Sequence, residues 1–492
     1  MKKIKYIIAS LLVVLFVGSC TEGWEDLNSD PNNPVDVPAM NILTYVERYS
    51  CDFLYDITQA EYSASFAHHT GKIQYIDESR YEFREGHING DWNSHMYAQL
   101  DISKIIDKAQ EAGNTNLEAI AMTMSAFLWQ KMTDTWGAVP FTEGAQGEDG
   151  IIQPQYDSQE TVYSGLLTML EDANTMFAAN TGIVTDADIL LGGDITWWRK
   201  FANSLHLRVA IRMSDVDETA ASAEISKILD DPATYPILES NAEMVALQWD
   251  GSAWREPWMS NSTGRDDHAI AKTIVDFMLD LNDPRLPEYA HPAASDGQYR
   301  GVVVGIAEGN EGDFQLNEIS RIGERYRDDP TGLSYMMRYA EVEFLKAEAY
   351  ERGLATGDAQ AAYEAGITAA MEEHGVDAAD ITAYMANADV AWDDNTGTLG
   401  YTNLQKIYFQ KWFSLFKQGH EAWAETRRTD VPQLPHAPGS PYLGNGYDRP
   451  PFRWPYPSNE YTYNEDVVSQ WNTGIVDFFW GEQMWWDTRS VK

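Results

Sequence analysis

The chain has 492 residues, of which 44% are hydrophobic and 12% are aromatic, and its formal net charge at pH 7 is −41. The hydrophobic content is sufficient for a sizeable core and argues against wholesale disorder. A chain with this much negative charge repels phosphate backbones, so the composition excludes nucleic acid as a partner, and it would also be repelled by an anionic membrane surface.

The start of the chain shows the pattern of a bacterial lipoprotein signal. Three lysines precede an apolar run over 7–17, which is about half as long as the ~20 residues that a membrane span needs. Small residues then lead into Cys20. The pattern predicts a signal peptide over 1–19, cleavage before Cys20 and acylation of its thiol, so that acyl chains anchor the protein to a membrane. The alternative is an ordinary signal peptide followed by a chance cysteine.

The segment 20–38 is acidic, rich in Pro and Asn, and without hydrophobic periodicity, which predicts an extended tether. The only other cysteine is Cys51, so acylation of Cys20 leaves it without a disulfide partner. Because Cys51 lies in a helical pattern, it is predicted to be a small buried core residue. A reactive thiol is the alternative, although no nearby feature would obviously lower its pKa.

From Ala39 onward, apolar residues recur at steps of three and four, which is the period of a helix. After this first helix, further helices are predicted near 91–112, 116–133, 158–179, 197–214, 218–230, 267–281, 333–353, 358–374 and 402–418. Long loops rich in Gly, Pro and Asn separate them, over 137–157, 231–266, 283–332 and 430–470. The pattern alone therefore predicts an all-α chain with long loops, and loops of that length inside a compact domain are usually functional.

The clearest helical hairpin is predicted over 335–374, with its break at Gly353 and Gly357. Each helix gathers small and apolar residues on one face, and alanines at the contact would let the two antiparallel helices approach closely. Such a unit looks like one tetratricopeptide repeat of an α-solenoid, although no strict repeat of about 34 residues is visible elsewhere.

Common catalytic fingerprints are missing from the sequence, which has no nucleophile elbow, Walker loop or dinucleotide motif. The segment 420–424, HEAWA, lacks the second histidine of the zincin motif and with it a zinc ligand. The pair His68-His69 is predicted to point to opposite sides of a helix, on the surface or in the core. The segment 393–397, DDNTG, does not meet the EF-hand spacing and is predicted to be a solvated turn.

A series of sequence motifs follows the predicted lipoprotein signal in a fixed order. They are MSAF (124–127), TDTWGAVP (133–140), WWRKFANSLHLR (197–208), NDPRL (282–286), YAE with EA (339–341 and 348–349), QKWFSLFKQGHEAWAETRRTDVP (410–432) and PFRWPYPSNEYTYN (451–464). Together they resemble the SusD/RagB family of outer-membrane nutrient-binding lipoproteins, in its SusD-like branch. The resemblance covers nearly the whole mature chain.

This resemblance implies a fold and a function. The fold would be a single SusD-like helical domain over 39–492, all-α in the main, with a tetratricopeptide-like α-solenoid scaffold, long ligand-binding loops and few short strands. Such proteins sit on the outer face of the outer membrane, held by a lipid anchor. They act as a lid on a SusC-like TonB-dependent transporter, capture oligosaccharides or in some members peptides, and are neither enzymes nor cofactor-dependent.

Most residues of the shared motifs are expected to stabilise the scaffold. Arginines of these motifs would reach neighbouring carboxylates or buried backbone carbonyls: Arg199 and Arg208 toward carboxylates, and Arg427, Arg428 and Arg453 toward either. Trp92 and Tyr97, at helical spacing, are also assigned to packing.

Ligand contacts are expected from two loops outside those motifs, because ligands differ within the family. The first loop, 71–90, offers Tyr75, Arg80, Tyr81 and Arg84, and the second, 249–265, offers Trp254, Trp258, Asn261 and Arg265. Aromatic rings can stack on the apolar face of a sugar while amide and guanidinium groups bond its hydroxyls. The alternative is that these aromatic side chains pack on their own loops. The C-terminal cluster of Trp480, Trp485 and Trp486 is a weaker candidate.

Three functions remain open at this point. The first is a non-catalytic nutrient-capture lipoprotein, the second a surface lipoprotein enzyme such as a glycosidase, and the third a structural lid without a ligand of its own. No catalytic or metal-binding residue is assigned, because among 76 acidic residues a suitable carboxylate pair could always be found by choice.

Overall fold

The computed structural model describes residues 36–55, 61–258, 267–307, 309–310, 315–444, 446–472 and 483–490. The predicted signal peptide and Cys20 lie outside the described residues, as do most of the tether, Asn261, Arg265 and Trp480.

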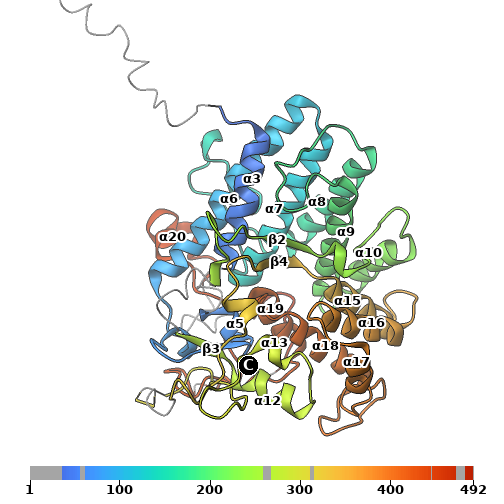
Figure 1. Cartoon of the computed structure of the whole chain (residues 1–492). Coiled ribbons are helices and arrows are strands. Elements are labelled where there is room, and N and C mark those ends of the chain that lie inside the picture. The colour runs from blue at the N-terminus through green and yellow to red at the C-terminus, as the bar shows by residue number, and fades with distance from the viewer. Residues whose placement is uncertain are drawn as a thin grey trace, which may run out of the picture.

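Helices dominate the fold, and those of the first half of the chain form a curved array (Figure 1). They are α3 (Ala39–Leu54), α6 (Glu85–Ala112), α7 (Thr115–Trp136), α8 (Gln159–Ala179), α9 (Ile195–Met213) and α10 (Glu218–Asp230). The short helix α5 (Ser63–Phe66) lies outside this array and packs on the helix Gly419–Thr429. In this array α3 packs on α6, and each later helix packs on the next, from α6 through α7, α8 and α9 to α10. A chain of packed neighbours is the arrangement of an α-solenoid, and it confirms the predicted mainly helical, tetratricopeptide-like scaffold.

The second half of the chain continues the helical scaffold. Its helices are α12 (Lys272–Asp280), α13 (Leu286–Tyr289), α14 (Glu324–Arg327), α15 (Tyr339–Glu351), α16 (Ala359–Glu372), α17 (Ala378–Met385), α18 (Asn403–Ser414), α19 (Gly419–Thr429), α20 (Ser458–Tyr463) and α21 (Glu465–Val468). The pair α15–α16 is the predicted hairpin, and α15 also packs on α18 and α9. The array of the first half and the helices of the second half therefore pack against each other where α15 meets α9.

Two small antiparallel sheets connect segments that lie far apart in the sequence. Strand β1 (Thr70–Lys72) pairs with β3 (His268–Ile270), and β2 (Val245–Gln248) pairs with β4 (Leu333–Met337). The first sheet joins the start of the 71–90 loop to the chain that follows the 249–265 loop. The first of the two loops predicted to bind ligand therefore starts at this sheet, and the second leads back to it.

Helix boundaries differ from the prediction where local sequence gave a weak or ambiguous signal. Residues 335–337 belong to β4 and not to the hairpin helix, because a short apolar run such as Tyr-Met-Met is compatible with either structure. His268–Ile270 likewise form a strand. The predicted helix 402–418 ends at Ser414, and the left-handed backbone of Lys417 (φ 67°) separates it from α19, which was not predicted. Helix α6 begins six residues before the predicted 91, despite two glycines in its first two turns.

Cys51 is fully buried in the core, which confirms its predicted role, and burial raises the pKa of its thiol far above the ordinary value. His68 and His69 are also buried, but they follow α5 and do not lie on a helix: the His69 ring bonds the Trp412 carbonyl at 3.0 Å. The 393–397 segment is a mostly exposed turn, as predicted.

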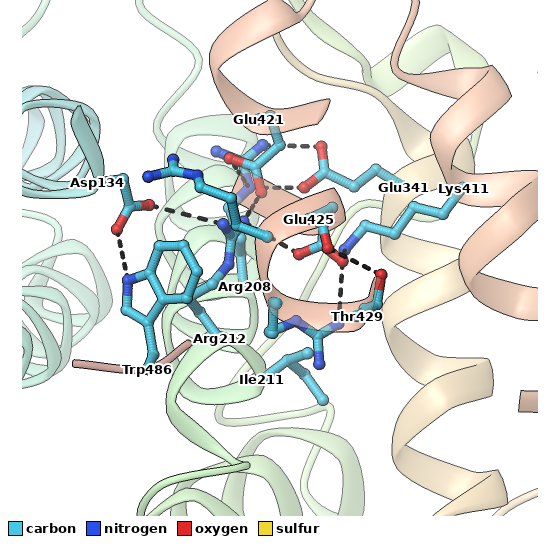
Figure 2. A network of polar contacts seen from close by, with 12 residues as sticks. Asp134, Arg208, Ile211, Arg212, Glu341, Lys411, Glu421, Glu425, Thr429 and Trp486 are labelled. Carbon is cyan, nitrogen blue, oxygen red and sulfur yellow. Dashed lines mark hydrogen bonds and ion pairs between the residues drawn. The ribbon is translucent and has the colours of Figure 1, made fainter. Parts of the chain in front are cut away.

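A buried network of charged side chains ties the scaffold helices together (Figure 2). Glu421 on α19 lies at its centre, with the Lys131 ammonium of α7 at 2.5 Å and an ion pair to Arg212 of α9. Burial alone would raise the pKa of Glu421, but Arg212, Lys131 and Arg208 together hold it well below its usual value. This carboxylate therefore remains charged inside the protein and serves the scaffold.

The motif arginines largely behave as predicted. Arg208 donates to both carboxylate oxygens of Glu341, at 2.6 and 2.8 Å, and Arg428 does the same to Glu348, at 2.6 and 2.7 Å. Arg427 donates to a backbone carbonyl at 2.6 Å. Arg199 is an exception, because it bonds the Asn174 side-chain carbonyl and a backbone carbonyl where a carboxylate was expected. Since such bidentate pairs are strong and directional, they fix the angles between the helices.

Candidate functional site

Helix α20 lies against α6 (Figure 1). A pocket of about 450 Å³ opens beside the start of α6. We call it the aromatic pocket. Its lining residues are Glu82, Phe83, Glu85, Ile88, Tyr442, Pro455, Tyr456, Pro457, Ser458 and Tyr461. The volume lies within the range of ~300–1,000 Å³ that is usual for small-molecule sites. Four of the ten lining residues are aromatic, two are acidic and none is basic.

Stacked aromatic rings hold one wall of the aromatic pocket in place. Phe83 lies flat on Tyr62, with ring centroids 4.8 Å apart, and Trp454 meets the edge of this stack at 5.1 Å from Tyr62. The Trp454 ring is in turn 5.5 Å from Trp136 on α7. The wall is therefore continuous with the hydrophobic core, which limits its freedom to move.

The floor around Tyr456 is fixed by polar contacts. Its hydroxyl donates to the Ala138 carbonyl at 2.8 Å, and the Arg453 guanidinium lies 4.6 Å from the centre of its ring. The Trp136 indole N–H donates to the Pro455 carbonyl at 3.0 Å. These contacts explain why Arg453, predicted to be structural, lies buried behind the pocket.

Hydrogen bonds join the two chain segments that form the rim. Ser458, the first residue of α20, donates to the Glu85 carboxylate and accepts a bond of 3.0 Å from the Asn89 side chain. Residues more than 360 positions apart in the sequence thus meet at one edge. Ring faces, a hydroxyl and two carboxylates on one concave surface can stack on sugar rings and bond their hydroxyls.

The predicted 71–90 loop contributes four residues to this pocket, but not those singled out from the sequence. Tyr75 is 59% exposed, away from the lining. Arg80 is buried and pairs with Asp77 at 2.6 Å. Tyr81 is fully buried, and its hydroxyl accepts a hydrogen bond of 3.0 Å from the Ala437 amide. The loop faces the pocket through Glu82, Phe83, Glu85 and Ile88.

The predicted tryptophan platform is divided between surface and core. Trp254 is 50% exposed, with the Arg48 guanidinium of α3 at 5.4 Å from its ring centre. Trp258 is buried, 5.5 Å from the Lys417 ammonium and 6.4 Å from the ring of Phe416. The two rings therefore do not form one exposed platform in this conformation, and the candidate at this loop is Trp254.

Trp254 and aromatic side chains of α3 together form an exposed aromatic patch. Arg48 also lies 5.7 Å from the ring of Tyr45, which stacks on Tyr49 at 5.3 Å. Tyr97 was assigned to packing, and this assignment is wrong, because its side chain is 60% exposed. Trp92, which was also assigned to packing, is buried as predicted. Helical spacing located Tyr97 on α6 but did not reveal which face of α6 was covered.

The described members of the C-terminal tryptophan cluster belong to the scaffold. Trp486 is fully buried, and its indole N–H donates to Asp134 at 2.9 Å. Trp485 packs 5.8 Å from Tyr163.

One group of side chains in the described residues could in principle hold a metal ion, but it already contacts a lysine of the same chain. Glu171, His206 and Glu224 offer ligand atoms within 4.8 Å of one another. However, the Lys227 ammonium pairs with Glu171 at 2.7 Å and also with Glu224, so it already occupies the place that a metal ion would take. The arrangement fits a structural charge cluster between α8, α9 and α10.

Residues of the sequence motif 451–464 line the pocket, although they were not predicted to be site residues. The motif was assigned to the scaffold because it matched the family, yet it supplies Pro455–Ser458 and Tyr461 to the lining. Tyr456 lies between two prolines, where a regular helix cannot continue, and that feature could have marked the segment as a pocket-lining one.

Comparisons with known proteins support one family. A protein-family model described as "SusD-like_2: Starch-binding associating with outer membrane" matches residues 31–457. No curated protein sequence matches the chain. In the part of the chain that the structure describes, no helix has the length and apolar character needed to cross a bilayer.

Solved structures share the fold over nearly the whole chain. A SusD homolog from Parabacteroides distasonis superposes with a TM-score of 0.83 at 21% identity, covering 92% of this chain and 99% of its own. A chitin-binding SusD homolog from Flavobacterium johnsoniae gives 0.77 at 22% identity, covering 92% and 98%. A SusD homolog from Bacteroides uniformis gives 0.78 at 23% identity, covering 92% and 100%.

Proposed function

The chain belongs to the SusD-like family, and we propose that it captures oligosaccharides at the bacterial cell surface and delivers them to a SusC-like TonB-dependent transporter. The family description associates its members with the outer membrane and with starch binding. The aromatic pocket is the observation that carries the proposal for this chain, because four ring side chains on a concave surface suit sugar rings.

A carbohydrate ligand is favoured over a peptide for two reasons. The pocket offers ring faces and hydroxyl-bonding groups but no exposed strand edge with which an extended peptide could pair. A structural relative with the same fold is described as chitin-binding. We propose the exposed Trp254 and Tyr75 as further contacts for a long chain, together with Asn261 and Arg265 from outside the described residues.

The test is a binding panel measured by isothermal titration calorimetry on the purified mature chain. The panel holds starch-derived and chitin-derived oligosaccharides and a set of peptides of similar length. We expect saturable binding to at least one oligosaccharide without release of shorter products. Binding of peptides alone would contradict a glycan ligand, and steady release of shorter sugars would favour the glycosidase alternative, for which Glu82 and Glu85 would be the first carboxylates to replace.

We propose that Cys20 carries the lipid anchor and places the protein on the exterior of the outer membrane, with 20–38 as its tether. Metabolic labelling with a fatty acid tests the anchor by comparing Cys20→Ala with Cys51→Ala, since only the former removes the proposed acylated thiol. Label that persists in Cys20→Ala would contradict the anchor. Protease shaving of intact cells tests the orientation, because protection of the protein would place it on the inner leaflet.

A transporter partner follows from the same proposal. A lid that retains ligand over a barrel must form a large contact, and obligate interfaces commonly exceed ~2,000 Å². Mild detergent extraction and pull-down through a C-terminal tag should recover a barrel protein. Repeated recovery of this protein alone, from cells that express the transporter, would favour a soluble capture role.

A further inference from the structure

We propose that the aromatic pocket selects oligosaccharides that carry free, protonated amino groups and disfavours acidic ones. This inference rests on the proposed function and adds the chemical class of the ligand. The starting observation is the charge of the lining: among its described residues are two carboxylates and one serine, but no lysine or arginine.

The first carboxylate, Glu82, is only partly neutralised. Its oxygen lies 3.2 Å from the Arg80 guanidinium, and 46% of its side chain is exposed. Arg80 also pairs with Asp77 at 2.6 Å, and the Asp77 side chain is 53% exposed. One positive charge is thus shared between two carboxylates, and this group keeps a net negative charge beside the pocket.

The second carboxylate, Glu85, is balanced by hydrogen bonding and not by a cation. It accepts the Ser458 hydroxyl and lies in the first turn of α6, where the helix dipole stabilises negative charge. No ion pair links it to a lysine or arginine in the part of the chain that is described. Its neighbour Arg84 instead pairs with the buried carboxylate of Glu78, which Lys72 also contacts at 2.7 Å.

The guanidinium of Arg453 is not part of the described pocket lining. It is buried, and it stacks on the Tyr456 ring 4.6 Å from its centre. A ligand in the pocket can therefore contact the two lining carboxylates, whereas Arg453 is covered by protein. The formal charge of −41 on the whole chain adds a long-range field of the same sign.

A protonated amino sugar matches this surface. Its ammonium can bond a rim carboxylate and can also approach an aromatic face, because the ring quadrupole attracts cations. A uronic acid would place a second negative charge against the same carboxylates, which is unfavourable. Neutral sugars lie between these two, since they retain stacking but gain no charge contact.

A matched ligand series tests the inference by calorimetry at about pH 6 and low salt, where the amino groups of the ligand are largely protonated. The series holds β-1,4-linked oligomers of glucosamine, N-acetylglucosamine and glucuronate with equal numbers of sugar rings. We expect the glucosamine oligomer to bind about five times more tightly than the neutral one, and glucuronate to bind most weakly. The preference should shrink at high salt, because screening weakens exposed charge contacts.

Glu85→Gln and the double variant with Glu82→Gln assign the preference to the pocket. Both variants should bring the affinity for the glucosamine oligomer close to that for the N-acetylglucosamine oligomer. The control Glu218→Gln, at the exposed start of α10, should leave the ratio of these two affinities unchanged. Equal affinity for all three oligomers, tighter binding of glucuronate, or a preference that survives the double variant would overturn charge selection while leaving glycan capture intact. Failure to bind any oligosaccharide, here and in the wider panel, would instead overturn the proposed function.

Discussion

The rings of Phe83 and Tyr62 lie face to face, with centroids 4.8 Å apart and planes inclined by only 4°. This contact joins the loop before α6 to the segment before α5, and it fixes a half-buried ring that lines the aromatic pocket. A ring that is already ordered loses little conformational entropy when a ligand stacks on it. The pocket is therefore prepared for binding by the same packing that stabilises the fold.

Tyr461 and Tyr463 provide a matched test of the pocket within one short helix. Tyr461 lines the pocket, whereas Tyr463 is 68% exposed and lies outside the lining. Tyr461→Ala should cost about 1–3 kcal/mol of binding free energy, by analogy with other aromatic stacking contacts. That loss is roughly a ten- to hundredfold weaker affinity, measured by calorimetry with whichever oligosaccharide the unmodified protein binds.

Tyr463→Ala is the control for that measurement and should bind as the unmodified protein does. Circular dichroism must show that both variants keep their helical content. If Tyr461→Ala binds normally while Trp254→Ala does not, the ligand site lies on the exposed patch around Trp254 and not in the aromatic pocket.

Trp258 should behave as a core residue and Trp254 as a surface residue. Trp258→Ala removes a buried ring and exposes the buried Lys417 ammonium beside it, so we expect a loss of about 3–5 kcal/mol in the free energy of unfolding. Trp254→Ala should change it by less than about 1 kcal/mol, because half of that ring is already in water. Urea denaturation followed by circular dichroism measures both. Similar stability of the two variants would mean that the Trp258 ring is not packed in the core.

Much of the scaffold could be predicted from the sequence because its helices are long and amphipathic. The predicted ends of α8, α9 and α10 agree with the structure within two residues. Strand β4 could not be predicted, since its apolar run resembles a buried helix and its strand character depends on pairing with β2.

The pocket was harder to predict than the scaffold because it is formed by tertiary contact. Phe83 and Tyr461 are separated by most of the chain and meet only after α20 packs on α6. The sequence placed the 71–90 loop at the site but could not show which side chains turn inward. Tyr81, for example, adopts a left-handed backbone (φ 72°) that sends its ring into the core.

Gly366 lies at a close contact between α15 and α16. A Cβ atom there would lie 2.7 Å from the Phe344 ring, so Gly366→Ala should destabilise the protein by about 1–3 kcal/mol through overpacking. Helix propensity alone predicts the opposite sign, because alanine is favoured over glycine by about 1 kcal/mol. Gly90→Ala on α6 is the matched control: its Cβ would meet nothing within 4 Å, so it should stabilise. Thermal denaturation measures both, and a stabilising Gly366→Ala would show that the hairpin has room to relax.

Glu421→Gln should be among the most damaging single changes in the scaffold. The substitution keeps the size of the side chain but removes the negative charge that faces Lys131 and Arg212, both of which are buried. Lys131 would lose its ion-pair partner, whereas Arg212 keeps Glu425 at 3.1 Å, and removing one partner of a buried ion pair costs about 3–5 kcal/mol. The control is Asp276→Asn, which removes an exposed ion pair with Lys272 and should cost less than about 1 kcal/mol.

A double-mutant cycle separates the charge contact from other effects of the Glu421 substitution. Adding Lys131→Met to Glu421→Gln removes the cation that the first substitution leaves unpaired, so the double variant should be more stable than the sum of the two single losses predicts. Urea denaturation at neutral pH gives the four unfolding free energies. If Glu421→Gln alone leaves the stability unchanged, the cost of burying these charges already cancels their attraction, and the helices around α19 are held by apolar packing.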